Sequence, residues 1–189
     1  MRSDAELLEA WRAGDAAAGE ELVARHWTSV SRFCRSKIGD DGADLISQVF
    51  LACVEGKDRI AGDNIKAYLF AVARRRMAEH FRQRARAPVD LALTSVIDLG
   101  TGPVTRVARR QRSELLREGL ARIPVDDQIA LELAYFEGMS TKEIADVLEI
   151  AENTVRSRLS RARDKLREVL AKLAPPDEAA LADSQLDAR

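Results

Sequence analysis

Two short helical patterns near the C-terminal end constrain the fold more than any other part of the chain. They lie between Gly138 and Arg163, and a break at residues 149–152 separates them. Ser140, followed three residues later by Glu143, forms a capping box that sets the start of the first helix after Gly138. Helical stripes of apolar residues that are joined by so short a break predict a helix-turn-helix. The stripes are Ile144, Ala145, Leu148 and Ile150, then Val155, Leu159, Ala162 and Leu166.

The second helix of this pair has a polar and basic outer face. If its apolar residues turn inward, the 3.6-residue period turns Arg156, Ser157, Ser160, Arg161 and Asp164 outward. The N-terminal end of such a helix is the end that enters the major groove of DNA. Arginine can donate two hydrogen bonds to guanine, and serine can bond a base or a phosphate. We therefore expect this face to read base pairs.

Other cations on the same helix are better placed for phosphates, which position a protein on DNA without specifying sequence. These are Arg158, Arg163, Lys165 and Arg167. The set that we expect to contact DNA also includes Thr154 and Lys142. The alternative interpretation is a solvated basic helix on a protein-binding surface.

The rest of the chain has helical and not β periodicity, so we expect an all-α fold. Further helices are expected at residues 4–13, 16–38, 43–55, 65–84, 111–120 and 127–136. Between Ala87 and Arg109 the helical period fails, and Pro88, Gly100, Gly102 and Pro103 interrupt the chain, which predicts a linker. We expect two small helical domains (1–86 and 107–173) joined by a flexible linker (87–106), the second domain having four helices, followed by an acidic, disordered tail (174–189).

Charge is strongly segregated along the chain, although the formal net charge is only −1. Bases gather at residues 66–86 and 156–167, whereas acids gather at the two ends. The helix expected at 65–84 and its flank carry Arg74, Arg75, Arg76, Arg82, Arg84 and Arg86. These arginines would repel one another at low salt, so we expect an anionic partner here as well. A solvated helix face is the alternative.

Several classes of function have no support in the sequence. Two cysteines (Cys34, Cys53) and two histidines (His26, His80) are too scattered for a zinc site, and we expect no cofactor. We interpret both cysteines as buried thiols, with redox sensing as the alternative. No pair of residues is spaced for acid–base catalysis, so we expect no enzyme activity and no small-molecule substrate. The charged start and the lack of an apolar run of about 20 residues predict a cytoplasmic protein without a membrane segment.

Taken together, these features resemble the extracytoplasmic-function (ECF) group of bacterial RNA polymerase sigma factors, which belong to the sigma-70 family. Ser31 to Cys34 and Asp44 to Phe50 resemble the polymerase-binding region of that family. Tyr68 to Arg74 resembles its promoter-melting region, and Ile123 to Arg163 resembles its fourth region. The resemblance covers about Leu7 to Leu173.

The resemblance implies a sigma factor that binds core RNA polymerase and directs promoter-specific initiation without catalysing a reaction. It also implies promoter DNA and an anti-sigma factor as partners. Polymerase would be bound by Asp44, Leu45, Ser47, Gln48, Phe50 and Leu51. The loop at residues 56–64 would hold an extruded base of the minus-ten element. Contacts in minus-ten recognition and melting would come from Asn64, Lys66, Tyr68, Arg74, Arg75, Arg76 and Arg82. The DNA-contacting set of the helix-turn-helix would read the minus-thirty-five element.

Departures from the family pattern keep other interpretations open. Ser47 and Gln48 stand where the family usually has a glutamine and a glutamate, which favours a sigma-like decoy that titrates an anti-sigma factor. A LuxR-type helix-turn-helix regulator is a further alternative, but it leaves residues 7–86 unexplained. In the turn, Glu149 replaces a frequent glycine, and a positive φ there would cost about 1 kcal/mol. Asn153 also stands where glycine is common.

Overall fold

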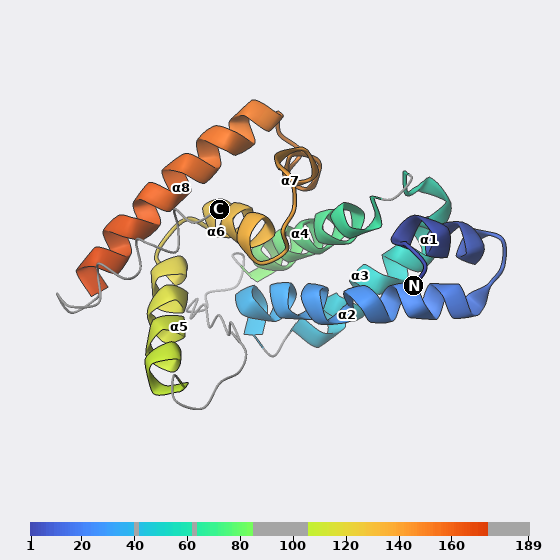
Figure 1. Cartoon of the computed structure of the whole chain (residues 1–189), viewed down its shortest axis with the longest axis horizontal. Helices are drawn as coiled ribbons and strands as arrows, with labels where there is room; N and C mark the ends of the chain where they lie inside the picture. The colour runs from blue at the N-terminus through green and yellow to red at the C-terminus, as the bar shows by residue number, and fades with distance from the viewer. Residues whose placement is uncertain (40–41, 62–63, 85–105, 174–189) are drawn as a thin grey trace. The chain divides into compact units, whose positions relative to one another are not determined.

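The computed structural model describes residues 1–39, 42–61, 64–84 and 106–173, which form helices joined by turns without a β-strand among them (Figure 1). In chain order the helices are α1 (Asp4–Arg12), α2 (Ala16–Ile38), α3 (Gly42–Gly56), the short 3-10 helix η2 (Lys57–Arg59), α4 (Ile65–Arg84), α5 (Arg106–Ala121), α6 (Val125–Tyr135), α7 (Thr141–Leu148) and α8 (Glu152–Leu173). They form two compact units, one built around α1–α4 and one around α5–α8. The all-α prediction is therefore confirmed for the described residues.

Most helix bounds agree with the expected ones, but α5 differs. It begins at Arg106, five residues before the expected start at Gln111, and so takes up residues that we expected to be irregular. The arginines and alanine of this stretch are good helix formers and need no apolar stripe to form a helix. The remainder of the expected linker (residues 87–105) and the expected tail (174–189) lie outside the described residues.

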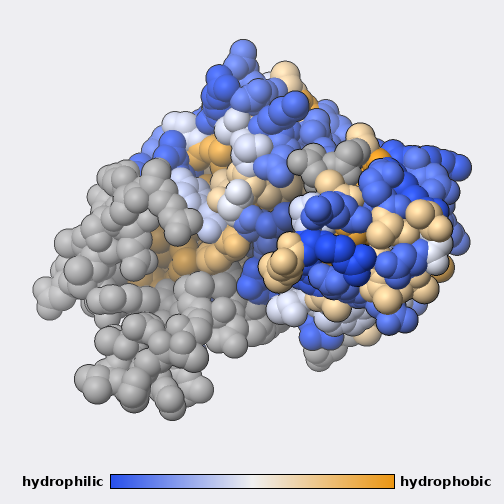
Figure 2. Space-filling model, turned by 45° about the vertical axis from the view of Figure 1, so that its right-hand side comes forward, coloured by the Kyte–Doolittle hydropathy of each residue, from blue (hydrophilic) through white to orange (hydrophobic). Residues whose placement is uncertain are grey.

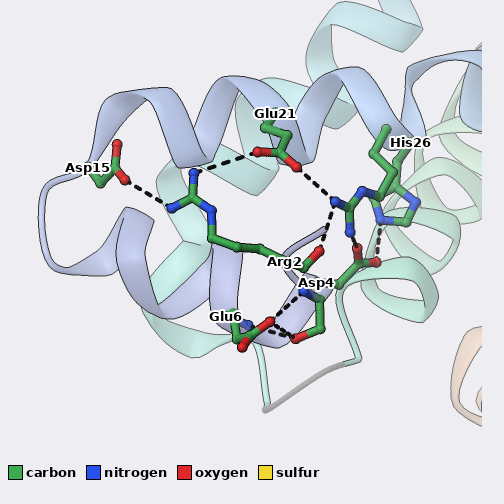
Figure 3. Close-up of polar contacts among 8 residues, drawn as sticks. Arg2, Asp4, Glu6, Asp15, Glu21 and His26 are labelled. Carbon is green, nitrogen blue, oxygen red and sulfur yellow. Dashed lines mark hydrogen bonds and ion pairs between the residues drawn. The ribbon is translucent and has the colours of Figure 1, made fainter.

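A polar network fixes α1 to α2 in the first unit (Figure 3). Arg25 of α2 donates to Asp4 (2.6 Å), and His26 Nε2 lies 2.7 Å from the other oxygen of the same carboxylate. Arg2 reaches across to Asp15 at 3.2 Å and to Glu21 at 3.6 Å. Because charged groups from both helices share these bonds, α1 is held in one register along α2.

The core of the first unit combines aliphatic and aromatic side chains. Leu7 and Leu8 of α1 are both fully buried. Phe33 of α2 meets Phe70 of α4 edge to face, with ring centroids 5.0 Å apart. Trp27 is 43% exposed. Its ring lies at the edge of the inward face and stacks on Phe50 at 5.0 Å, because an indole is rarely buried completely.

Both cysteines lie inside this core, as the sequence predicts. Burial raises the pKa of the Cys34 thiol to about 12 and that of the Cys53 thiol to about 11. Since the thiolate is the reactive form, neither side chain is suited to redox sensing at neutral pH.

The second unit packs α5 and α6 against the C-terminal part of α8. The buried side chains of this cluster are Leu120, Ile123, Leu131, Ala162, Leu166 and Leu170. A Cβ atom at Gly119 would lie 2.7 Å from Leu170 Cδ2, so this glycine lets α5 approach α8 closely. The first turns of α8 contribute no side chain to this cluster. Among the described residues, no helix has the length and apolar character needed to span a membrane.

Candidate nucleic-acid interface

The turn between α7 and α8 has the geometry that a helix-turn-helix requires. The Ser140 N–H donates to the Glu143 carboxylate (2.7 Å), and the Glu143 N–H donates back to Ser140 Oγ (3.3 Å), which confirms the predicted capping box. At the other end of α7, the Ile150 N–H donates to the Ala145 carbonyl (3.2 Å). This bond is characteristic of a Schellman motif, whose residue after the cap adopts a left-handed conformation.

Glu149, which stands where the family frequently has glycine, occupies that left-handed position with φ 57°. It is the only non-glycine residue with positive φ among the described residues. Asn153, the other position where glycine is common, lies inside α8 without a positive φ, so its side chain carries no such strain.

Glu152 joins the start of α8 to the start of α7. Its carboxylate accepts a hydrogen bond from Thr141 Oγ1 (2.7 Å) and forms an ion pair with Arg156 (2.6 Å). The bond from Thr141, followed by that from Arg156, lowers the pKa of the Glu152 carboxyl. A negative charge in the first turn of a helix is also favoured by the helix dipole. The ion pair therefore orients Arg156 before any ligand is bound.

The polar face of α8 is exposed in the way that the helical period predicts. Val155 and Ala162 are fully buried, while Arg156, Ser157, Ser160 and Arg161 are exposed. Thr154 and Lys142, the other two residues of the predicted base-reading end, are exposed as well. The orientation of this face is thus confirmed, and its contact with DNA stays a prediction.

The cations that we expected to contact phosphates already have partners within the unit. Arg158 forms an ion pair with Asp126 at 3.3 Å, and Lys165 forms one with Asp127 at 2.8 Å. Arg163 Nη1 lies 3.5 Å from the Tyr135 hydroxyl, and Arg167 pairs with Asp164 at 3.1 Å. The first three contacts brace α8 against α6. Spacing along α8 could not reveal these three contacts, because their partners lie on α6, whereas Asp164 and Arg167 have the i,i+3 spacing of one helix.

The basic helix α4 has a narrower cationic face than its sequence suggests. Arg75 and Arg82 are exposed on one side of the helix, seven residues apart, with Glu79 between them. Arg74 and Arg76 are half-buried at the flanks, and Arg76 pairs with Glu79 at 3.1 Å. Lys66 is also half-buried. The Arg84 side chain and Arg86 lie outside the described residues.

Tyr68 and Asn64 form hydrogen bonds at the junction between α3 and α4. The Tyr68 hydroxyl donates to the Ala52 carbonyl at 3.2 Å, and burial raises the pKa of this hydroxyl. The Asn64 carbonyl accepts the first backbone bond of α4 from the Tyr68 N–H (3.0 Å). Tyr68 is thus anchored by its hydroxyl, which limits its freedom to stack on a base.

The residues of α3 that we expected to bind polymerase divide into two groups. Asp44, Ser47, Gln48 and Leu51 are exposed, whereas Leu45 and Phe50 are only 6% exposed. Leu45 and Phe50 belong to the core of the first unit, so they have little exposed area with which to contact a partner. The Gln48 amide donates a hydrogen bond to the Asp44 carboxylate at 2.8 Å. Asp44 is the one acidic residue among these four exposed residues, and its carboxylate therefore already has a partner within α3.

Besides Leu51, which we expected at this surface, Val54 and Trp27 are exposed apolar side chains that were not expected from the sequence. Figure 2 shows hydrophilic residues with smaller hydrophobic areas between them on the coloured part of the face that it draws. Large apolar side chains are exposed at few of the described positions. Leu51 is 56% exposed, Val54 is 47% exposed and Trp27 is 43% exposed. Ser47, Leu51 and Val54 have the i, i+4, i+7 spacing of one helix face, and this spacing could have identified Val54.

Comparison with known proteins reveals sequence similarity along most of the chain. Residues 113–166 match the family described as Sigma-70, region 4. The ECF RNA polymerase sigma factor SigM of Mycobacterium tuberculosis is 30% identical over 172 residues, covering 89% of this chain and 85% of that protein. The RNA polymerase sigma-H factor of Pseudomonas aeruginosa is 25% identical over 184 residues, covering 90% and 95%.

Solved structures with the same fold include CnrH in complex with the cytosolic domain of CnrY. That chain is 23% identical, with a TM-score of 0.68, and the match covers 92% of this chain and all of that one. The sigma factor RpoE from Bartonella quintana, solved with the anti-sigma factor NepR, is 22% identical with a TM-score of 0.65, covering 80% and 96%. Similarity extends through the first unit, which a LuxR-type regulator would leave unexplained.

Proposed function

Since this chain belongs to the extracytoplasmic-function group of the sigma-70 family of RNA polymerase sigma factors, we propose that it binds core RNA polymerase and directs it to a specific set of promoters. In this role it supplies sequence recognition while the polymerase performs the chemistry, so the chain itself catalyses no reaction. It acts in the cytoplasm, where the polymerase and its DNA template are found. The unit of residues 1–86 corresponds to sigma region 2, and the unit of residues 107–173 to sigma region 4.

The observation that carries this proposal is the exposed N-terminal face of α8. Arg156, Ser157, Ser160 and Arg161 lie outward on a helix whose opposite side is buried, behind a Schellman turn. A helix of this kind fits the major groove, and arginine and serine have the donors that base edges accept. We assign this face, with Thr154 and Lys142 beside it, to the minus-thirty-five element. Arg158 and Arg163 hold α8 on α6 and contact DNA at the edge of the site.

The first unit supplies the contacts to polymerase and to the melted strand. Polymerase docks on the exposed face of α3, where Leu51 and Val54 lie beside Ser47 and Gln48. Arg75 and Arg82 on the exposed side of α4 bind the phosphates of the minus-ten strand, with Arg74, Arg76 and Lys66 at the flanks. Tyr68 and Asn64 position the start of α4.

Reconstituted transcription tests the proposal directly. The purified chain is mixed with core RNA polymerase and fragmented genomic DNA, and the transcripts are sequenced. We expect new start sites that share two spaced elements, absent with core enzyme alone. A chain that binds polymerase yet yields no shared upstream element at any start site would contradict the assignment of α8.

Regulation by an anti-sigma factor is part of the proposal, because RpoE of Bartonella quintana was solved with one. A sigma-like decoy would bind an anti-sigma factor equally well but would give no transcripts. The Gln48–Asp44 bond favours this second candidate, because it engages the only acidic side chain among the residues of α3 that we expect to bind polymerase. The transcription experiment separates the two functions.

A further inference from the structure

The side chain of Arg12, at the end of α1, crosses to the backbone of the turn that follows α3. Its Nε and Nη2 atoms donate to the Lys57 carbonyl at 3.0 and 2.8 Å, and Nη2 also donates to the Ile60 carbonyl. The Arg12 side chain is only 20% exposed. A guanidinium has five N–H donors in a fixed planar arrangement, or fork. Arg12 can therefore donate three hydrogen bonds to the two carbonyls at once.

A second set of contacts runs from the turn back to α1. Lys57 Nζ donates to the Trp11 carbonyl (3.2 Å) and lies 5.4 Å from the centre of the Trp11 ring. The Trp11 ring in turn lies against the bare backbone of α2, where a Cβ atom at Gly19 would come within 2.5 Å of Trp11 Nε1. The end of α1 is therefore fixed on α2 and clamps the turn from residue 57 to residue 60.

The clamped turn presents one cation outward. Ile60 is 3% exposed and anchors the turn in the core, whereas Asp58 and Arg59 are exposed. Arg59 lies in η2, in the segment between α3 and α4, so the turn adds an exposed cation shortly before the basic helix α4. Arg59 could not be singled out from the sequence, because the turn has no periodicity that would orient its side chain.

Resting on the proposed function, we propose that Arg59 contacts the minus-ten strand and that Arg12 is the positioning residue that fixes Arg59 for this task. Both carbonyls held by Arg12 belong to the segment that includes Arg59, so loss of the fork frees the turn to adopt other conformations. Recognition of individual bases depends on placement within about an ångström, and freedom of the turn therefore reduces discrimination more than it reduces overall binding.

The test uses holoenzyme on two sets of promoters, one varied at single minus-ten positions and one varied at the minus-thirty-five element. Arg12→Lys keeps the positive charge but loses the fork. We expect it to lower discrimination among minus-ten variants by about tenfold, an order of magnitude typical of a displaced recognition group, and to leave minus-thirty-five discrimination unchanged. Arg59→Ala, which removes an exposed side chain, should lower minus-ten discrimination to a similar extent.

Arg25→Lys is the matched control, because Arg25 also holds the start of α1 through hydrogen bonds, in this case to the Asp4 carboxylate and the Arg2 carbonyl. It should leave minus-ten discrimination at the level of the unmodified chain. The inference is overturned if Arg12→Lys lowers transcription equally from every promoter, if it behaves like Arg25→Lys, or if Arg59→Ala discriminates normally. Failure of the proposed function would look different, since the unmodified chain would then give no promoter-specific transcripts.

Discussion

Glu152 and Arg156 form an ion pair of 2.6 Å one helical turn apart, at the start of the helix that we assign to the minus-thirty-five element. The same carboxylate accepts a hydrogen bond from Thr141 at the start of α7. One acidic group therefore links the starts of the two helices and orients the arginine that we assign to base reading. An arginine that is oriented in advance loses less conformational freedom on binding, so this pair supports specificity.

Glu152→Gln should lower stability at neutral pH, and its effect should fade in acid. The hydrogen bond from Thr141 and the pair with Arg156 lower the pKa of the Glu152 carboxyl in the folded state. The charged form therefore stabilises the fold at pH values above the ordinary carboxyl range, and this contribution is lost as pH falls through the lowered pKa. Thermal unfolding followed by circular dichroism should show the two midpoints converging on acidification. A constant difference at every pH would contradict this account.

Arg161→Ala should relax promoter specificity. Arg161 is exposed on the outward face of α8, and its Nε donates only a long bond of 3.3 Å to the Ser157 carbonyl. We expect the affinity for minus-thirty-five DNA to fall by roughly 1 to 3 kcal/mol, with one base position losing its preference. Fluorescence anisotropy with duplexes substituted at single positions measures both effects.

Arg158→Ala is the matched control for this measurement, because Arg158 is 22% exposed and pairs with Asp126. It should weaken binding to all duplexes by similar factors and should lower the unfolding midpoint slightly. If Arg161→Ala also weakened every duplex equally, Arg161 would be a phosphate contact and not a base contact.

Glu149→Gly should stabilise the turn between α7 and α8. Glu149 has φ 57° at the end of α7, a conformation that costs an L-residue about 1 kcal/mol and a glycine almost nothing. Release of this cost should raise the unfolding midpoint by several degrees, about 4–8 °C for a unit of this size. Glu149→Ala removes the same carboxylate but keeps the Cβ atom, and it should give no such rise. Equal midpoints for the two variants would mean that the strain is relieved in another way.

The sequence predicted local structure well because each signal was local. The capping box at Ser140 and the outward face of α8 follow from spacing within a few residues, whereas attention to Glu149 came from the family resemblance. Contacts between helices were not predictable in this way. The pairing of Arg158 with Asp126 and the clamp of Arg12 on the turn join residues 32 and 45 or more positions apart, and no period in the sequence relates them.

Leu51→Asp should abolish binding to core polymerase without harming the fold. Leu51 is 56% exposed on the face of α3 that we assign to docking, so an acidic side chain remains solvated in the free chain but is buried unpaired in the complex. Co-migration with core polymerase on size-exclusion chromatography measures the loss. Ala17→Asp, at an exposed position in the first turn of α2, is the control and should bind normally. Retained binding by Leu51→Asp would place the docking surface elsewhere.

Gly56→Ala should destabilise the junction between α3 and α4, and Tyr68→Phe should rescue it. A Cβ atom at Gly56 would lie 2.3 Å from the Tyr68 hydroxyl oxygen but 3.3 Å from the ring carbon that bears it. The alanine therefore displaces the hydroxyl from the Ala52 carbonyl and costs about 1 to 3 kcal/mol, as overpacking of a core does. Phenylalanine removes the oxygen and with it the closest contact. Urea unfolding of the two single variants and the double variant should give a double variant more stable than Gly56→Ala alone, since residues in contact are not additive. Strictly additive losses would show that the chain relieves the clash by moving the backbone of the turn.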